Sequence, residues 1–243
     1  MDNLQGVLRV IDKAKENVEQ TWNSNLIEKV NECFSYAEDI SIWVSRIEAL
    51  ENNILVAKSL DECKNSLLMS VQGYYKEAIF SLRQFYEHIL FAVYLSTSDL
   101  KYRLWKKGQY DMSWATITAT DTGIFSSQFI RCYADDFIID RSADLIEEAM
   151  VIYRDCSEFV HGNYKKIEHI QAGLPYDACL LEKYLEYFSR IEYIVAIAVF
   201  IRFRELLDID QKFFLDLEPI ILQHLGTLPE VQRLYSSEVE KNE

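Results

Sequence analysis

Apolar residues recur three or four positions apart along most of the chain, which is the spacing of a helix that buries one face. No segment shows the strict alternation of apolar and polar residues that is typical of a half-buried strand. The pattern predicts helices over residues 3–22, 25–49, 59–95, 100–107, 142–161, 177–207, 217–225 and 229–235, with short helices and loops between 109 and 140. We expect the first two helices to form an antiparallel hairpin.

Capping residues indicate where these helices begin and end. Ser59, with Glu62 three residues later, forms a capping-box pattern, and the helix that Ser59 starts is expected to be broken or kinked near Gly73. Further caps are expected at Ser98 or Asp99 and at Ser142, with helix ends at Gly108 and Gly162.

Composition supports a fold of few, long helices. Glycine occurs 7 times and proline 3 times in 243 residues, whereas all-β and doubly wound α/β folds need both residues in their many turns. We therefore expect an all-α, multi-helix up-and-down bundle. Residues 1–55 would form an extra N-terminal helical hairpin packed on a helical domain of residues 56–243.

Charge and hydropathy narrow the class of protein. The net charge of −14 argues against a general nucleic-acid coat protein but leaves room for one local basic site. The longest apolar run, residues 193–201, falls short of the ~20 residues of a membrane span, so we expect a soluble, cytoplasmic protein without membrane contact. The five cysteines form no CxxC pair and are expected to be buried free thiols.

Residues 153–164, YRDCSEFVHGNY, hold the strongest candidate for a functional site. At about 100° per residue, Arg154, Ser157, Glu158 and His161 fall on one helical stripe. Arg154 and His161 lie two turns apart, roughly 10 Å along the axis, so both side chains can reach one phosphate. The stripe is equally what an ordinary solvated helix face looks like, in which Arg154 and Glu158 form an i,i+4 ion pair.

Arg154, six intervening residues and His161, inside an all-α chain, resemble the R-x4–6-H motif of HEPN domains. Asp155 matches the polar residue that directly follows the arginine in that motif. The strings SEFVHG and SLRQFYEHILFAVYL also resemble phage-defence HEPN proteins, and the resemblance covers residues 56–207. Some HEPN toxins carry H-x-Y, whereas two residues separate His161 from Tyr164 here, so the resemblance does not extend to that tyrosine.

The resemblance implies a HEPN-like bundle that dimerises so that two motif helices face each other. Many HEPN proteins are metal-independent ribonucleases of toxin–antitoxin, abortive-infection and CRISPR systems. In that chemistry His161 would act as general base or acid, and Arg154 would hold the phosphate oxygens. Ser157 would bond a phosphate oxygen, and Glu158 would orient either partner. The product would be a 2′,3′-cyclic phosphate, and DNA, which lacks the 2′-hydroxyl, should resist cleavage.

Two further groups of residues fit this chemistry. Arg83 and Glu87 are four residues apart in an apolar helix, where they predict a structural ion pair or a support for the motif helix. Residues 101–107, KYRLWKK, combine basic and aromatic side chains, which suits RNA. They equally suit a surface helix with solvated lysines. The candidate RNA-binding residues are Lys101, Arg103, Trp105, Lys106 and Lys107.

Two functions from different classes remain open at this stage. One is a HEPN-type endoribonuclease of antiphage defence or a toxin system, acting on RNA as a homodimer. The other is a non-catalytic all-α interaction or regulatory subunit of a two-protein defence or toxin–antitoxin system, which the acidic net charge favours. No HExxH motif and no His/Cys cluster occurs, so we expect neither a metal nor another cofactor, and His169 and His224 receive no role.

Overall fold

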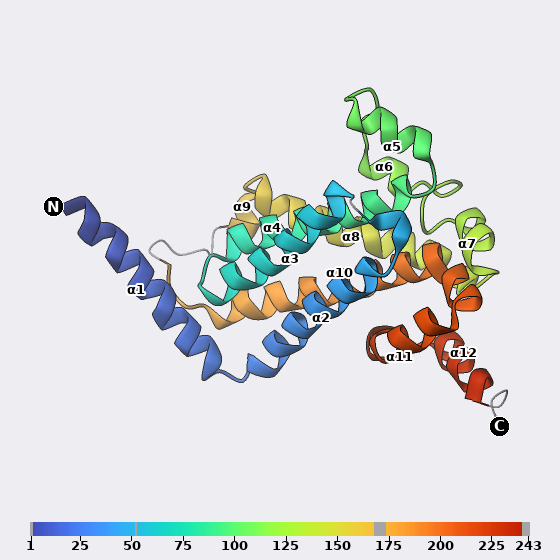
Figure 1. Ribbon diagram of the computed structural model, residues 1–243. Coiled ribbons are helices and arrows are strands. Elements are labelled where there is room, and N and C mark those ends of the chain that lie inside the picture. Colours follow the sequence, from blue (N-terminus) through green and yellow to red (C-terminus); the bar gives the residue numbers. More distant parts are fainter. Residues whose placement is uncertain (1, 52, 168–173, 240–243) are drawn as a thin grey trace.

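Every regular element in the described part of the chain is a helix (Figure 1). The computed structural model describes residues 2–51, 53–167 and 174–239. The α-helices are α1 Asp2–Trp22, α2 Ile27–Ser45, α3 Ile54–Val71, α4 Tyr75–Leu95, α5 Asp99–Lys106, α6 Trp114–Ile117, α7 Ser127–Ala134, α8 Ser142–Val160, α9 Tyr164–Ile167, α10 Ala178–Ile209, α11 Gln211–Leu225 and α12 Pro229–Val239. Two short 3-10 helices cover Glu48–Leu50 and Ile139–Arg141. The predicted all-α class is confirmed, and the helices pack as a bundle.

The long central helix α10 forms the axis of this bundle (Figure 1). Each side chain from Ile194 to Ile201 is at most 1% exposed. Helices α2, α4, α7, α8 and α11 all pack against α10, so its apolar surface is covered on every side. Among the described residues, no helix combines the length and the apolar character that crossing a membrane requires.

Polar residues begin some helices, and glycines end others, at the predicted positions. The Ser98 hydroxyl accepts a hydrogen bond from the Lys101 amide at 3.3 Å and starts α5. The Asp177 carboxylate starts α10 in the same way. Gly108 and Gly162 follow α5 and α8 with φ angles of 66° and 71°, which glycine adopts without a steric penalty.

The helix predicted over residues 59–95, broken or kinked near Gly73, is broken there into two helices packed side by side, α3 and α4. Gly73, with a φ angle of 90°, lies in the turn between them. A Cβ atom at this position would collide with the side-chain amide of Asn17 in α1, so the tight turn requires glycine. The turn thus brings α3 and α4 together as a hairpin.

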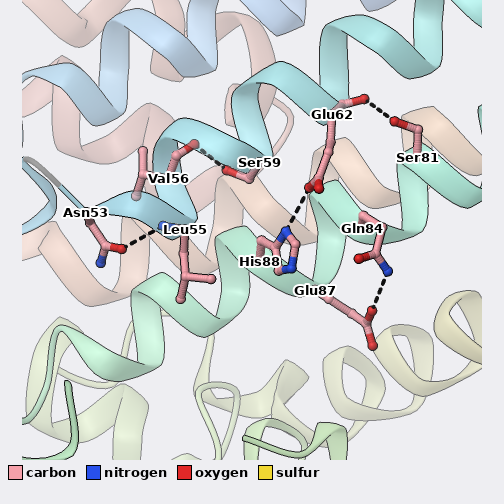
Figure 2. A network of polar contacts seen from close by, with 9 residues as sticks. All are labelled: Asn53, Leu55, Val56, Ser59, Glu62, Ser81, Gln84, Glu87 and His88. Carbon is pink, nitrogen blue, oxygen red and sulfur yellow. Dashed lines mark hydrogen bonds and ion pairs between the residues drawn. The ribbon is translucent and has the colours of Figure 1, made fainter. Parts of the chain in front are cut away.

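The predicted capping box at Ser59 is wrong. The apolar pattern continues upstream through Leu55 and Val56, and α3 begins at Asn53, whose Oδ1 accepts from the Leu55 amide at 3.0 Å (Figure 2). Ser59 is buried inside α3 and donates to the Val56 carbonyl at 2.8 Å. Glu62 therefore has no cap to complete, and its carboxylate is directed toward α4 (Figure 2).

Two other predictions about individual residues also fail. The Ser142 hydroxyl donates to the Phe125 carbonyl at 2.7 Å, and α8 begins without a side-chain cap. All five cysteines are free, but Cys132 and Cys179 are exposed rather than buried. Ser142 is used to fix the preceding loop against α8, which a local cap pattern does not reveal.

The N-terminal helices α1 and α2 diverge from their connection rather than lying side by side (Figure 1). Helix α1 is held where Asn17 Nδ2 donates to the carbonyls of Gln72 and Leu174 at 2.9 and 3.0 Å. Helix α2 belongs to the same hydrophobic core as α3 and α10. The predicted boundary after residue 55 falls in the first turn of α3.

His224 ties three helices together at the end of α11. Its Nδ1 lies 2.7 Å from Glu192 Oε1 of α10, and its Nε2 lies 2.8 Å from Asp39 Oδ2 of α2. The side chain is only 4% exposed. Burial alone would lower the pKa of His224, but the bonds to the two carboxylates outweigh it, so that the pKa is raised. Sequence spacing gave no sign of this site, because the three residues are far apart along the chain.

We expect His224→Gln to lower the free energy of unfolding by about 3 kcal/mol at pH 6, because it leaves two carboxylates without their cation. A histidine whose pKa is raised by folding contributes its full stabilisation below the unfolded pKa, and this is lost as pH rises through the folded pKa. The difference between the two proteins should therefore shrink as pH increases above ~7. Urea denaturation across a pH series measures it.

His161→Gln, at an exposed histidine, is the matched control and should change the free energy of unfolding little. A His224→Gln penalty that grows with pH would contradict the assignment of a charged His224 in the fold.

Candidate ribonuclease site on helix α8

Helix α8 buries the apolar arc that the sequence predicts. Ala149, Ile152, Cys156 and Phe159 are each at most 1% exposed. They face the core between α4 and α10, both of which pack on α8. At its end the His161 amide donates to the Ser157 carbonyl at 2.9 Å. The predicted helix and its buried face are thus confirmed.

The opposite face presents the candidate catalytic residues. Arg154 and His161 are exposed, and Ser157 and Glu158 are half-buried. Neither Arg154 nor His161 forms a side-chain hydrogen bond or ion pair with another described residue. The Ser157 hydroxyl donates to the Tyr153 carbonyl at 2.7 Å, which leaves its oxygen lone pairs for other contacts. The two exposed side chains stand two turns apart, roughly 10 Å along the axis.

Asp155, the residue next to the arginine, lies on the other side of the helix. Burial is the main cause of the raised pKa of Tyr187 in α10, and the Asp155 carboxylate adds to it. Asp155 also contributes to the raised pKa of Arg190, after the bond from Arg190 to Glu148. The Asp155 carboxylate therefore lies within electrostatic reach of Tyr187 and Arg190 of α10.

Arg83 and Glu87 of α4 lie directly against the motif helix. Arg83 Nη2 is 3.2 Å from Glu87 Oε1 and donates to the Tyr153 hydroxyl at 2.8 Å. The two charged side chains are 13% and 14% exposed. The guanidinium also lies over the Tyr153 ring, 4.7 Å from its centroid, and Trp114 stacks on the same ring with centroids 4.2 Å apart. Tyr153, the residue before Arg154, is thus held at its ring and at its hydroxyl.

The environment keeps the Tyr153 hydroxyl protonated. Burial is the main cause of its raised pKa, and hydrogen bonding to Glu87 adds to it, while Arg83 acts in the opposite direction. The hydroxyl can therefore donate to Glu87 while it accepts from Arg83. These contacts fix the part of α8 that carries Arg154.

A second polar contact on α4 was not expected from the sequence. His88 Nδ1 lies 2.8 Å from Glu62 Oε2 of α3 (Figure 2). Burial raises the pKa of Glu62, and the bond to His88 opposes that effect. Gln84 Nε2 donates to the other oxygen of Glu87 at 3.2 Å. The half-buried side of α4 thus carries polar side chains, of which His88 contacts α3 and Arg83 contacts α8.

The basic segment of α5 is only partly available for an anion. Lys101 Nζ donates to the Tyr94 hydroxyl at 2.6 Å, which is the main cause of its raised pKa. Arg103 Nε lies 2.7 Å from its own helix neighbour, Asp99 Oδ2. The exposed ends of the segment are Lys106 and Lys107.

The aromatic side chains of this segment pack mainly inward. Trp105 stacks on Tyr102 with ring centroids 6.0 Å apart, and both pack against the hydrophobic core. Lys106 Nζ lies 5.5 Å from the Tyr102 ring centroid. The packing leaves the two terminal lysines as the parts of α5 best placed to meet a phosphate.

The structure does not bring α5 next to Arg154 and His161 within one chain. Helix α4 runs antiparallel to α8, since Arg83 meets Tyr153 while Tyr86 donates to the Ala149 carbonyl at 3.4 Å. Helix α5 follows the far end of α4, on the side where α8 begins (Figure 1). The path from Tyr94 along α4 and then along α8 to His161 is therefore ~28 Å at 1.5 Å per residue.

In the described part of the chain, no group of three histidine, cysteine or acidic side chains is arranged to hold a metal ion. His169, which received no role, lies outside the described residues. Comparison with protein-family models, with curated proteins and with solved structures found no match for this chain.

We expect Arg83→Ala to lower the free energy of unfolding by about 3 kcal/mol, because it removes the cation from the mostly buried Glu87 carboxylate, which then keeps only neutral partners. Arg103→Ala is the matched control, since it removes the exposed member of an i,i+4 pair with Asp99 and should cost less than ~0.5 kcal/mol. Chemical denaturation of both variants measures the difference. Equal losses would mean that the Arg83–Glu87 pair does not stabilise the contact between α4 and α8.

Proposed function

We propose that the chain is a metal-independent endoribonuclease of the HEPN type. The observation that carries the proposal is the exposure of Arg154 and His161 on one face of α8, two turns apart, on a helix that is rigidly packed on its other side. Exposed side chains that pair with no other described residue are available to a substrate. Their types, a guanidinium and an imidazole, match phosphoryl chemistry.

The proposed reaction needs no group that the chain does not supply. An imidazole at His161 takes the proton of the 2′-hydroxyl, and the 2′-oxygen attacks the adjacent phosphorus. The bond to the 5′-oxygen breaks, and that oxygen takes up a proton from a second acid, which another copy of the chain would supply. The products are a 2′,3′-cyclic phosphate and a free 5′-hydroxyl. The Arg154 guanidinium binds the phosphate oxygens as negative charge accumulates on them.

The contacts of Tyr153 support a positioning role for α4 in this proposal. Arg83, Glu87 and Trp114 hold Tyr153, and the next residue is Arg154. A guanidinium that must meet a phosphate in a fixed geometry benefits from a backbone that cannot shift. Ser157 and Glu158 remain candidates for contacts to the phosphate and to His161. Asp155 would act only indirectly, through α10.

A single motif helix offers one histidine, whereas transfer of a proton to the leaving group calls for a second acid or base. We therefore propose a homodimer in which the α8 helices of two copies approach each other, as the resemblance implies. The antiphage or toxin setting belongs to the same proposal and rests on the resemblance alone.

The second candidate is a non-catalytic interaction or regulatory subunit. The net charge of −14 favours it, because a strongly acidic surface repels RNA and attracts basic proteins. In that case Arg154 and His161 would be solvated surface residues.

We expect His161→Ala to reduce cleavage of RNA by about 10²–10⁴-fold while leaving the melting temperature nearly unchanged, because the side chain is exposed. Arg154→Ala should have an effect of similar size, and Arg154→Lys should recover only part of the activity, since an ammonium cannot form the two-pronged contact. Purified protein incubated with total RNA in EDTA, followed on a denaturing gel, gives the measurement.

Two exposed residues outside the stripe serve as controls for these variants. Asn163 follows α8 directly, and Arg131 lies on α7. Both Asn163→Ala and Arg131→Ala should retain full activity. If the unaltered protein leaves RNA intact at every concentration, the non-catalytic candidate replaces the ribonuclease.

We expect changing both Lys106 and Lys107 to glutamine to weaken RNA binding and to flatten its dependence on salt, by about one unit of slope for each phosphate that a lysine no longer neutralises. Single-turnover cleavage at saturating RNA should remain nearly unchanged, because α5 lies far from His161. Fluorescence anisotropy with a labelled RNA, across a salt series, tests this. An unaltered slope would identify both lysines as ordinary solvated surface.

A further inference from the structure

Helix α1 carries a stripe of large apolar side chains that the rest of the chain does not cover. Val7, Leu8 and Ile11 are 56%, 48% and 45% exposed, and Trp22 is 69% exposed. Val18 continues the stripe between them. Isolated exposed apolar residues are common on protein surfaces, but a contiguous stripe along one helix indicates a contact surface.

A different side of the same helix attaches it to the bundle. Ala14, Asn17 and Thr21 are buried, whereas every side chain from Gln5 to Asp12 is exposed. The N-terminal half of α1 therefore projects beyond the bundle (Figure 1). Beside its attached half runs a shallow, mainly apolar groove, lined by Ile11, Ala14, Lys15, Val18, Glu19, Gln72 and Tyr74.

We propose that this stripe binds the same stripe of a second copy of the chain, with the two α1 helices antiparallel. Leu8, Ile11, Lys15 and Val18 are spaced three, four and three residues apart, which is the spacing of a helix–helix seam. When two such helices are antiparallel about residue 13, Leu8 lies opposite the partner's Val18. Ile11 then lies opposite the partner's Lys15, and the projecting half of each helix fills the groove of the other copy.

Charge selects the antiparallel arrangement. Lys15 is the charged residue within the stripe, and its ammonium already lies 3.6 Å from its own Asp12. In the antiparallel register it also comes beside the partner's Asp12. A parallel pair would instead place Lys15 beside the partner's Lys15, where the two ammonium groups repel each other.

The same charges make a lipid surface a poorer occupant. Helix α1 contains four acidic and three basic residues, whereas helices that bind anionic membranes are rich in lysine and arginine on their polar face. A second copy satisfies the apolar stripe and Lys15 together. The contact does not depend on ribonuclease activity, because it uses none of the residues of α8.

Light scattering on the full-length protein tests the contact. We expect the unaltered protein to associate at micromolar concentration, as a dimer if α1 is the sole contact and as a larger assembly if the α8 helices also pair. Ile11→Asp should weaken the α1 contact at least ~10-fold and lower the mass by that association step, since it buries an unpaired carboxylate in the seam. Leu215→Asp, at a residue of α11 that is 56% exposed, is the matched control and should leave the mass unchanged. A monomeric unaltered protein, or an Ile11→Asp variant with the same mass as the unaltered protein, overturns the proposal.

Disulfide trapping tests the register and separates this contact from one made by α8. In a background in which the exposed Cys132 and Cys179 are serine, Leu8→Cys and Val18→Cys chains of different tag length are mixed and oxidised. We expect the mixed disulfide between the two variants to predominate, because only that pair brings the sulfur atoms within bonding distance. Predominant Leu8→Cys homodimers would overturn the antiparallel arrangement.

Discussion

Helix α10 has no polar side between Ile194 and Ile201, and the rest of the fold follows from the need to cover it. A helix that is apolar all round is stable in water only when neighbours exclude solvent from every direction. Helices α2, α4, α7, α8 and α11 provide that cover. Arg83 of α4 and Tyr153 of α8 meet between those two helices, where the Arg83 side chain remains 13% exposed.

Local patterns predicted the helices well because each depends on residues close in sequence. The apolar spacing located α8 and α10 almost to the residue. Asp177 begins α10 through its own side-chain carboxylate, and Gly162 ends α8 through its own backbone conformation. The exposure of Arg154 and His161 on one face of α8 followed from the same spacing. Where a local rule had two solutions, as at Ser59, the longer apolar pattern of α3 decided between them.

Contacts between helices could not be predicted in this way. Helical periodicity specifies which side of a helix is buried, but not which polar residue of another helix it meets. His224 with Asp39 and Glu192 is such a contact, and His88 with Glu62 is another. The pairing of Arg83 with Glu87 could be predicted, because the two residues are four positions apart on one helix. Their contact with Tyr153 of another helix could not.

Because Asn17 attaches α1 toward one end of the helix, a tilt at Asn17 moves the opposite end by the largest distance. One side-chain amide holds the carbonyls of Gln72 and Leu174, and about ten residues of helix project beyond it toward Val7, a length of ~15 Å. A tilt of about 10° at Asn17 therefore displaces the helix at Val7 by roughly 2.5 Å. Small movements of the chain at Leu174, just before α10, are magnified at the far end of α1.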